Sequence, residues 1–279
     1  MRLVTYRAEG AERAGVQTAG GVLDAATLLA EESLGLRQLI AAGRIDELRG
    51  RIEEGAVDPI ADAQLLPPVT DPDKIVCIGL NYRSHAEEAG IDPPGQPTFF
   101  AKFRNALAPP GTAVELPASS GKVDYEAEVA FVVGRRAKDV SVDDALDVIA
   151  GYMLLNDLSA RDLQFATPQW MPGKVFDGSA PCGPVLVTPE EAGAPDEISF
   201  ALDLNGERMQ EASTSDLIFS IPELVSRLSR SMTLEPGDIV STGTPSGVGS
   251  VRDPQVWLKA RDEIVISSPS LGELKTTMR

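Results

Sequence analysis

The sequence predicts a β-rich α+β fold preceded by a small N-terminal α/β module, and three observations lead to this prediction. After residue 73, short runs of β-branched residues bounded by Gly, Pro, Asn or Asp dominate the chain, as is typical of strands. Helical periodicity is concentrated before residue 64. The proline-rich segment LLPPVTDP lies between these regions and indicates a connector. The predicted organisation is therefore a module over 1–64, a linker over 65–72 and a catalytic domain over 73–279.

The N-terminal module begins with a strand-like segment, Leu3–Tyr6, and a turn at Gly20–Gly21. Between residues 36 and 52, apolar residues recur at spacings that are mostly three or four, which predicts a pair of amphipathic helices. Gly43 and Gly55 are expected to end them.

The later region contains six predicted strands and one clear helix. The helix covers residues 222–231, because Ser220 is followed three residues later by Glu223, the pattern of a capping box. The strands are KIVCIGL, EVAFVVG, GPVLVTP, ISFALDLNG, GDIVSTG and DEIVISS.

Composition excludes several classes of protein. Acidic residues outnumber basic ones by 42 to 25, and this net charge of −17 would repel nucleic-acid phosphates and anionic lipid. Cys77 and Cys182 are too few and too far apart for a disulfide framework or a zinc finger. No apolar core of a signal peptide follows the first residues, so a cytoplasmic protein is expected.

The most informative segment is KVDYEAEVAFVVG. Side chains alternate along a strand, so Asp124, Glu126 and Glu128 share one face with Ala130 and Val132. Carboxylates two residues apart repel each other where water is scarce, and either a bound cation or the uptake of protons would relieve this repulsion. A strand end in full solvent is the alternative, because three acids cost little there.

A further carboxylate follows some thirty residues later. In GYMLLNDLSARD an apolar run ends at Asn156 and Asp157. A lone Asp at a strand end is commonly a cap or turn residue, but beside the acidic strand it could provide a third oxygen ligand. Three carboxylates suit Mg²⁺ or Mn²⁺, with Ca²⁺ as an alternative, rather than zinc.

His85 is the only histidine, so any water-activating imidazole must be this one. It lies in GLNYRSHAEEAG, a predicted helical turn ended by Gly90. Glu88, at i+3, can face the imidazole and raise its basicity, which suits a general base. An exposed surface histidine among common acidic residues is the alternative.

Three loops could complete a site, and each has an ordinary explanation. The Gly/Ser/Thr loop STGTPSGVG (Ser241–Gly249) could hold a carboxylate or be a simple turn. Lys174, in PGKVFDGS, could be a solvated lysine. The segment FATPQWMP is expected to shape the far end of a pocket, with Trp170 as an apolar wall or as plain packing.

Taken together, five segments resemble the fumarylacetoacetate hydrolase family from about Asp73 to the C-terminus. They are GLNYRSHAEE, VDYEAEVAFVVG, GYMLLNDLSARDLQ, GKVFDGSAPCGP and STGTPSGVG. The resemblance implies a mixed β-sandwich or roll of the type found in that family's C-terminal domain. It also implies a homodimer and one divalent ion per active site.

The resemblance assigns roles by position. Glu126, Glu128 and Asp157 match the metal ligands, and Lys174 matches a lysine that supports the substrate oxygens. His85 with Glu88 resembles a water-activating dyad on a lid segment. The remaining matches are substrate-binding or site-lining residues, namely Arg161, Gln164 and Thr244. Asp124 has no implied role and is expected to lie behind the site or on the surface.

The resemblance implies chemistry on a small 2-oxo acid. Hydrolysis of a C–C bond in an acylpyruvate is the first expectation. Decarboxylation of oxaloacetate or isomerisation of a dienol in aromatic-acid catabolism would use the same metal chelate. A metal-stabilised binding protein without catalytic activity is the non-enzymatic alternative.

Overall fold

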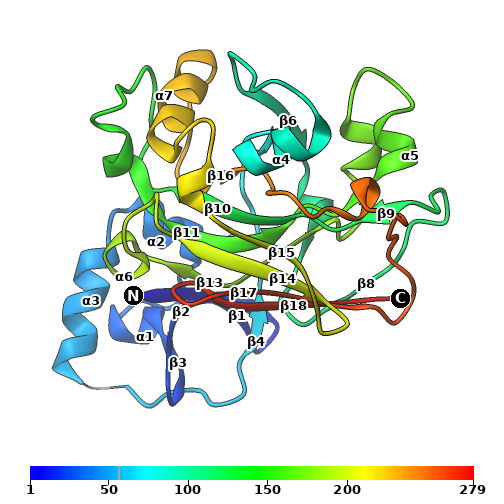
Figure 1. Ribbon diagram of the computed structural model, residues 1–279. Coiled ribbons are helices and arrows are strands. Elements are labelled where there is room, and N and C mark those ends of the chain that lie inside the picture. Colours follow the sequence, from blue (N-terminus) through cyan, green and yellow to red (C-terminus); the bar gives the residue numbers. More distant parts are fainter. Residues whose placement is uncertain (56) are drawn as a thin grey trace.

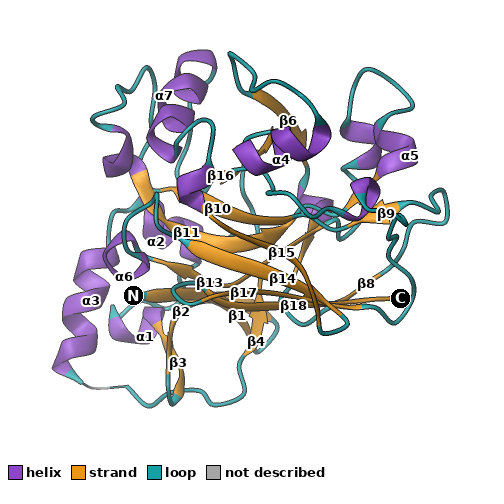
Figure 2. Cartoon of the chain, viewed as in Figure 1, coloured by secondary structure: helices purple, strands orange, loops and turns teal. Residues whose placement is uncertain are grey.

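Two β-sheets pack face to face, and helices lie around them (Figures 1 and 2). The computed structural model describes residues 1–55 and 57–279. The strands of the larger sheet are, in spatial order, β3 (Gly21–Asp24), β2 (Ala11–Thr18), β1 (Arg2–Ala8), β13 (Ala180–Val187), β11 (Ile149–Asn156), β10 (Ala127–Val133), β16 (Ile239–Ser241), β5 (Ile75–Gly79) and β6 (Thr98–Lys102). In addition, β4 (Gln64–Leu66) pairs with β1, and β7 (Leu107–Ala108) pairs with β13.

The smaller sheet contains the C-terminal strands. In spatial order these are β15 (Glu207–Ser213), β14 (Ser199–Leu204), β17 (Glu263–Ser268), β18 (Gly272–Met278) and β8 (Ala113–Val114). A separate two-stranded ribbon joins β9 (Val123–Asp124) to β12 (Ser159–Ala160). Most neighbouring strands are antiparallel, but β16 runs parallel to β5. The predicted β-rich fold is confirmed.

The helices are short and peripheral. Figure 2 shows α4, α5 and α7 along the upper side of the sheets and α1, α2 and α3 on the left. Their bounds are α1 (Ala25–Leu28), α2 (Leu36–Ala41), α3 (Ile45–Glu54), α4 (Arg83–Ala89), α5 (Arg161–Gln164), α6 (Pro189–Ala192) and α7 (Ile221–Ser231). Short 3₁₀ turns are η1 (Arg104–Ala106), η2 (Ala145–Val148), η3 (Met171–Gly173), η4 (Thr214–Asp216) and η5 (Gly249–Val251). None of the helices in the described part of the chain is long and apolar enough to cross a bilayer.

Alternation along β10 separates two hydrophobic cores. Val129, Phe131 and Val133 point into a core shared with β14, β17 and β18 of the smaller sheet. Ala130 and Val132 point into a second core, which α1, α2 and α3 cover. Because both faces of β10 are packed, the strand is apolar on both sides at this end.

Local sequence signals set the predicted helix ends. Gly55 ends α3 with φ +68°, and Gly90 ends α4 with φ +66°, a conformation that glycine adopts without steric cost. At the start of α7, the Ser220 N–H donates to Glu223 Oε2 at 2.9 Å, so the predicted capping box is present.

The N-terminal module continues the larger sheet. β1 pairs antiparallel with β13, with Leu3 opposite Leu186. A polar cluster around Asp24, which lies at the end of β3, fixes the module internally. The Asp24 carboxylate accepts hydrogen bonds from the Tyr6 hydroxyl, from Arg13 Nε at 2.7 Å and from the Thr27 N–H at 2.7 Å.

Candidate metal centre and active site

Three buried carboxylates meet where two neighbouring strands end. β10 begins at Ala127 and pairs with Asn156, the last residue of β11. Glu126 and Glu128 therefore flank the start of one strand, and Asp157 follows the end of the other. The Asp157 N–H donates to the Glu126 carbonyl at 2.9 Å, which fixes this register. One carboxylate oxygen from each of the three acids lies within 4.8 Å of the others.

The acidic segment is not the single continuous strand that its alternation predicts. It is interrupted between β9 and β10, where the Glu126 N–H donates to the Asn156 side chain at 3.1 Å instead of to a ladder partner. Asp124 pairs with Ser159 in the small ribbon. It therefore lies outside the metal cluster, and it is fully buried rather than on the surface.

The three acids are electrostatically unequal. Burial, followed by repulsion from Asp157 and Glu126, raises the pKa of Glu128 well above its usual value. Burial also acts to raise the pKa of Glu126, but attraction to Arg161 and Lys174 outweighs it and leaves a pKa of about 2. Of the two carboxylate oxygens of Glu128, only Oε2 accepts hydrogen bonds from the described residues, and both neighbouring acids repel this side chain.

Lys174 is buried at the centre of the cluster rather than solvated in its loop. Its Nζ donates to Glu126 Oε2 at 2.7 Å and to Asp157 Oδ2 at 2.8 Å. Burial lowers the pKa of Lys174, but the attraction of Asp157 and Glu126 dominates and the net pKa is raised. The lysine is therefore cationic and can stabilise negative charge.

A second buried lysine, Lys102, lies behind Asp157 at the end of β6. Its Nζ is 2.8 Å from Asp157 Oδ1, and it donates to the carbonyl and hydroxyl of Ser179 at 3.0 Å each. Lys102 Nζ and Asp157 Oδ1 form an ion pair, but the contact lacks hydrogen-bond geometry. Asp157 Oδ1 therefore has no hydrogen-bond partner among the described residues. Sequence reasoning missed Lys102, because nothing near it in the chain marks it as part of a site.

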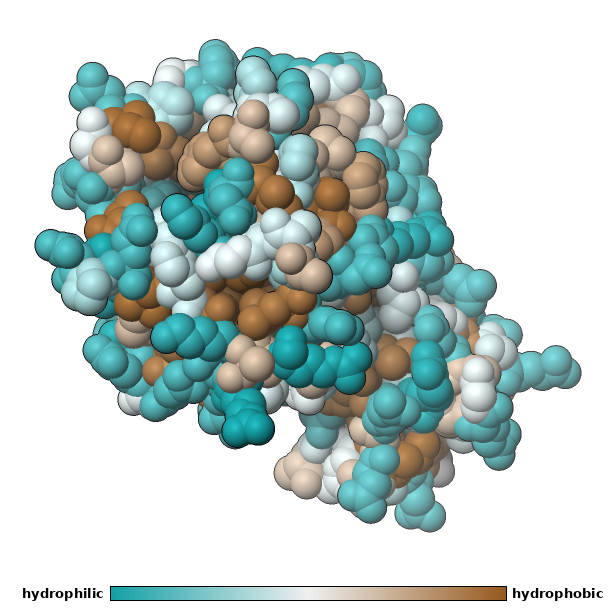
Figure 3. Space-filling view, turned by 90° about the vertical axis from the view of Figure 1, so that its right-hand side faces the viewer, coloured by the Kyte–Doolittle hydropathy of each residue, from teal (hydrophilic) through white to brown (hydrophobic). Residues whose placement is uncertain are grey.

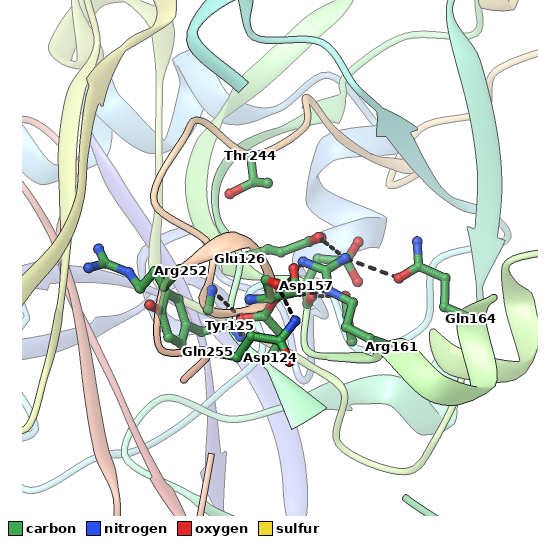
Figure 4. A network of polar contacts seen from close by, with 12 residues as sticks. Asp124, Tyr125, Glu126, Asp157, Arg161, Gln164, Thr244, Arg252 and Gln255 are labelled. Carbon is green, nitrogen blue, oxygen red and sulfur yellow. Dashed lines mark hydrogen bonds and ion pairs between the residues drawn. The ribbon is translucent and has the colours of Figure 1, made fainter. Parts of the chain in front are cut away.

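Arg161 links the cluster to Asp124 (Figure 4). Its Nε and Nη2 lie 2.9 and 2.8 Å from Asp124 Oδ2, and its Nη1 lies 2.7 Å from Glu126 Oε1. The same Nη1 donates to Gln164 Oε1 at 3.0 Å. Arg161 thus directs most of its N–H groups at other protein side chains, and it positions Glu126 instead of pointing freely into the site.

Asp124 also holds the loop after β16. Its Oδ1 accepts from the Gly249 N–H at 2.7 Å, and its Oδ2 accepts from the Ser250 N–H at 3.1 Å. A Cβ on Gly249 would lie 2.1 Å from the Val256 carbonyl oxygen and 2.8 Å from Asp124 Oδ1, so only glycine fits there. Asp124 therefore joins the loop at η5 to Arg161 and, through it, to Glu126.

The three carboxylates fit a divalent ion. The donors are hard oxygens, as Mg²⁺ and Mn²⁺ prefer. Both hydrogen bonds to Glu128 reach Oε2, from the Ser241 hydroxyl at 2.5 Å and the Gly243 N–H at 3.0 Å. Its Oε1 and the Asp157 Oδ1 atom remain without hydrogen bonds in the described ranges 1–55 and 57–279. The repulsion on Glu128 is what a cation would relieve.

A cavity of about 570 Å³ opens onto these acids. His85, Gln164, Lys174 and Thr244 line it together with the carboxylates, as does Arg161, so the structure brings all the sequence-predicted site residues except Glu88 to its wall. Glu88 contacts His85 from behind: Glu88 Oε2 lies 3.3 Å from His85 Nδ1. The predicted i, i+3 pair on α4 is present.

Glu88 also fastens α4 to the glycine-rich loop, because its Oε1 accepts from the Gly247 N–H at 2.9 Å. In the same loop the Thr244 hydroxyl is already committed. It donates to the Ala127 carbonyl at 3.0 Å and accepts from Gln210 Nε2 at 2.9 Å. Gln210, on β15 of the other sheet, was not predicted. The Thr244 backbone N–H, by contrast, has no hydrogen-bond partner among the described residues.

Comparison with known proteins agrees with this geometry. The family described as fumarylacetoacetate (FAA) hydrolase C-terminal matches residues 74–279. A bovine (Bos taurus) protein named "Oxaloacetate tautomerase FAHD2B, mitochondrial" is 41 % identical over 216 residues, which cover 77 % of this chain and 69 % of that protein.

Solved structures that match the whole chain include two hydrolases. Fumarylacetoacetate hydrolase from Exiguobacterium antarcticum has a TM-score of 0.87 and 31 % identity, covering 100 % of this chain and 99 % of that one. Maleylpyruvate hydrolase from Sphingobium sp. SYK-6, in complex with manganese(II) and pyruvate, has a TM-score of 0.83 and 31 % identity, covering 100 % and 98 %. With its divalent metal site at Glu126, Glu128 and Asp157, the chain belongs to the fumarylacetoacetate hydrolase family.

Proposed function

We propose that this enzyme hydrolyses a C–C bond in a small 2-oxo acid of the acylpyruvate type, with the electrons of that bond leaving as an enolate. One observation carries the proposal: His85, backed by Glu88, lines the same cavity as the three metal-binding carboxylates and Lys174. A general base, a cationic side chain and a metal site therefore face one space.

The charge of the buried cluster favours an anionic substrate. With the ligands ionised, as metal binding requires, four carboxylates (Asp124, Glu126, Glu128 and Asp157) face three cationic side chains (Lys102, Lys174 and Arg161). A divalent ion turns the remaining single negative charge into a single positive one. One substrate carboxylate then neutralises the cluster.

The residues divide the work as follows. An ion such as Mg²⁺ or Mn²⁺ would supply Lewis acidity to the carboxylate and keto oxygens of the 2-oxo acid. His85 takes a proton from the water that attacks the distal carbonyl, and Glu88 holds the imidazole in the orientation that allows this. The C–C bond between the attacked carbon and its neighbour breaks, and pyruvate leaves as its enolate. Lys174 stabilises the charge on that enolate.

The substrate-binding roles follow from which groups are uncommitted. The Thr244 N–H, rather than its hydroxyl, would bind the substrate carboxylate. Gln164 would donate from Nε2, which has no partner among the described residues, since its Oε1 is held by Arg161. Arg161 would act on the substrate only through Glu126.

The test is a substrate panel with chelator-treated protein restored with Mg²⁺ or Mn²⁺. Acetylpyruvate and fumarylpyruvate are followed by release of pyruvate, and oxaloacetate by loss of its enol absorbance and by CO₂ release. Glu126→Ala should lose every activity, while His85→Ala should lose hydrolysis more severely than decarboxylation. Full activity of Glu126→Ala, or of wild type in chelator, would overturn the metal assignment.

Tautomerisation of oxaloacetate is the second candidate, and the 41 % identity to the bovine protein named as such a tautomerase favours it. This reaction needs proton transfer at the 2-oxo acid but no attacking water. Rapid enol–keto interconversion without any acylpyruvate cleavage would select it. Binding of the metal with no turnover on any of these acids would instead indicate a silent binding protein.

We also expect a homodimer in the cytoplasm. The dimer is tested by measuring the molar mass of the protein by light scattering after size-exclusion chromatography at several concentrations. The compartment is tested by fractionation, since the bovine relative is named as mitochondrial.

A further inference from the structure

The cavity has two chemically different ends. Its inner end contains the carboxylates and Lys174, whereas its outer part is lined mainly by apolar side chains from several segments. These include Phe100, Phe165, Trp170, Val251, Trp257 and Ile91. The inner end accounts for a 2-oxo acid head, and the outer part has no role in the chemistry proposed above.

The apolar wall begins beside the metal site. Lys174 Nζ lies 5.0 Å from the centre of the Phe100 ring, and Phe100 packs edge-to-face on Trp170 with ring centres 5.8 Å apart. Trp170 in turn lies against the backbone of Gly79, where a Cβ would be only 2.2 Å from the indole Cζ3. The indole is therefore held in place by close packing at the end of β5, and this part of the apolar wall is well ordered by its contacts.

The outer rim carries large apolar side chains that water reaches. Phe165 is 67 % exposed, Ile91 53 % and Val251 43 %, and they come from three separate segments that converge on this one cavity. Figure 3 shows hydrophobic residues gathered near the middle of the face that carries α5, with hydrophilic residues around them. Convergent exposed apolar groups of this kind mark ligand sites.

Size and charge point in the same direction. A cavity of about 570 Å³ is in the range that suits drug-sized ligands. A four-carbon acid would leave most of this cavity empty. Among the cationic residues that line it, Arg161 and Lys174 are engaged with acids. Lys122, whose Nζ lies 5.9 Å from the centre of the Trp257 ring, is the other. Asp162 also lines the cavity, and its negative charge offsets the positive charge of Lys122. Among these cations, a second carboxylate could pair only with Lys122.

We propose that the natural substrate carries a bulky apolar chain or aromatic ring beyond its 2-oxo acid head, and that Trp170 and Phe165 select it. This inference rests on the proposed function, because it assumes that the head binds at the metal. Each methylene buried against this wall should improve affinity about fourfold, the equivalent of about 0.8 kcal/mol.

The test uses 2-oxo acids that lack the cleavable 4-oxo group, so that binding is measured without turnover. Affinities of the Mn²⁺-loaded protein for pyruvate, 2-oxooctanoate and 2-oxooctanedioate are measured by calorimetry. We expect 2-oxooctanoate to bind at least tenfold more tightly than pyruvate, and the dicarboxylate of equal length to lose most of that gain. Equal binding of pyruvate and 2-oxooctanoate, or tightest binding of the dicarboxylate, would overturn the proposal.

Variants assign the preference to the wall. Trp170→Ala should lower the ratio of 2-oxooctanoate to pyruvate affinity at least fivefold. Phe165→Ala, which removes an exposed side chain and so leaves folding intact, should lower it about threefold. Phe103→Ala is the matched control, because Phe103 is also half exposed but does not line the cavity. A ratio that Phe103→Ala lowers as much as Phe165→Ala does would contradict the assignment.

A failure of the proposed function gives a different result. If the metal-bound 2-oxo acid head were wrong, pyruvate would not bind in Mn²⁺, and 2-oxooctanoate would bind equally well with the ion or with chelator. Loss of the chain-length preference with pyruvate binding intact refutes only the apolar selection.

Discussion

The chain buries carboxylates in two regions, the cluster around Asp24 and the metal centre, and treats them differently. Asp24 is surrounded by donors, and although burial raises its pKa, hydrogen bonds from Arg13, Tyr6 and Thr27 bring the net pKa well below the usual range. At the metal centre, Glu128 faces other acids and its pKa is raised. A buried carboxylate that accepts hydrogen bonds on both oxygens stabilises the fold, whereas an excess of buried carboxylates indicates that a cation belongs there.

The largest expected effect sharpens this difference at the metal centre. Glu128→Gln keeps an oxygen to accept from Ser241 and Gly243 but removes the charge. Mn²⁺ affinity should fall more than about 100-fold, since loss of a direct ligand should exceed the effect of losing an outer-shell partner. The metal-free protein should melt at a higher temperature, because one repelling charge is gone. Calorimetric titration and thermal melts measure the two effects, and a lower melting temperature would contradict the second.

At Asp24 the sign reverses, and Asp24→Asn should destabilise the protein by about 2–4 kcal/mol, because Arg13 and Tyr6 lose a buried charged partner. Urea unfolding measures the free energy. Asp46→Asn is the matched control, since Asp46 pairs with Arg49 at 2.8 Å with its side chain 87 % exposed. Exposed pairs of this kind contribute at most about 1 kcal/mol. A similar loss in both variants would remove the distinction.

Asp124 shares a property with each region. Like Asp24 it is fully paired, and like the metal-centre acids it affects the metal site, because Arg161 connects it to the ligand Glu126. In Asp124→Asn, Arg161 loses one of its two carboxylate partners, so it should bind the other, Glu126, more strongly. Mn²⁺ affinity should then fall about tenfold, as for outer-shell partners of other metal sites. Glu115→Gln, which removes the acid of an exposed pair with Arg279, should leave affinity unchanged. Unchanged Mn²⁺ affinity in the Asp124 variant would show that Asp124 only holds the loop.

The smallest effect is the pH dependence of the Asp24 cluster. Because the folded-state pKa of Asp24 is lowered, the unfolded chain takes up the proton first. The stabilisation is complete above the unfolded value of about 3.9 and is lost as the pH falls toward the folded pKa. The difference in the free energy of unfolding between wild type and Asp24→Asn should therefore be about 1 kcal/mol smaller at pH 3 than at pH 7. Urea unfolding of both proteins from pH 7 to pH 3 checks this, and a constant difference would contradict it.

Local signals carried the predictions that succeeded. The helix ends at Gly55 and Gly90, the capping box at Ser220 and the contact of His85 with Glu88 all depend on residues within four positions of each other. The sequence groups Asp157 with Glu126 and Glu128 as a candidate third ligand, and the family resemblance assigns all three to the metal. In the structure, β10 and β11 form a hairpin whose open ends bring these acids together.

Contacts between distant segments were beyond such reasoning. Lys102 contacts Asp157 across 55 positions, and Gln210 reaches Thr244 from the other sheet. The interruption before β10 also depends on a distant group, the side chain of Asn156. In each case the deciding partner is set by how sheets pack, which no local pattern encodes. The pairing of β1 with β13 has the same origin.

The division of the cavity between strands and loops has an evolutionary consequence. The metal-binding acids are held in register by β10 and β11, so changes there endanger the reaction itself. The outer wall comes largely from the segment 165–172, from the chain around Ile91 and from η5. Substitutions in these segments can alter which chain or ring is accepted while the strands stay the same, so a lineage could acquire new substrates without rebuilding its chemistry.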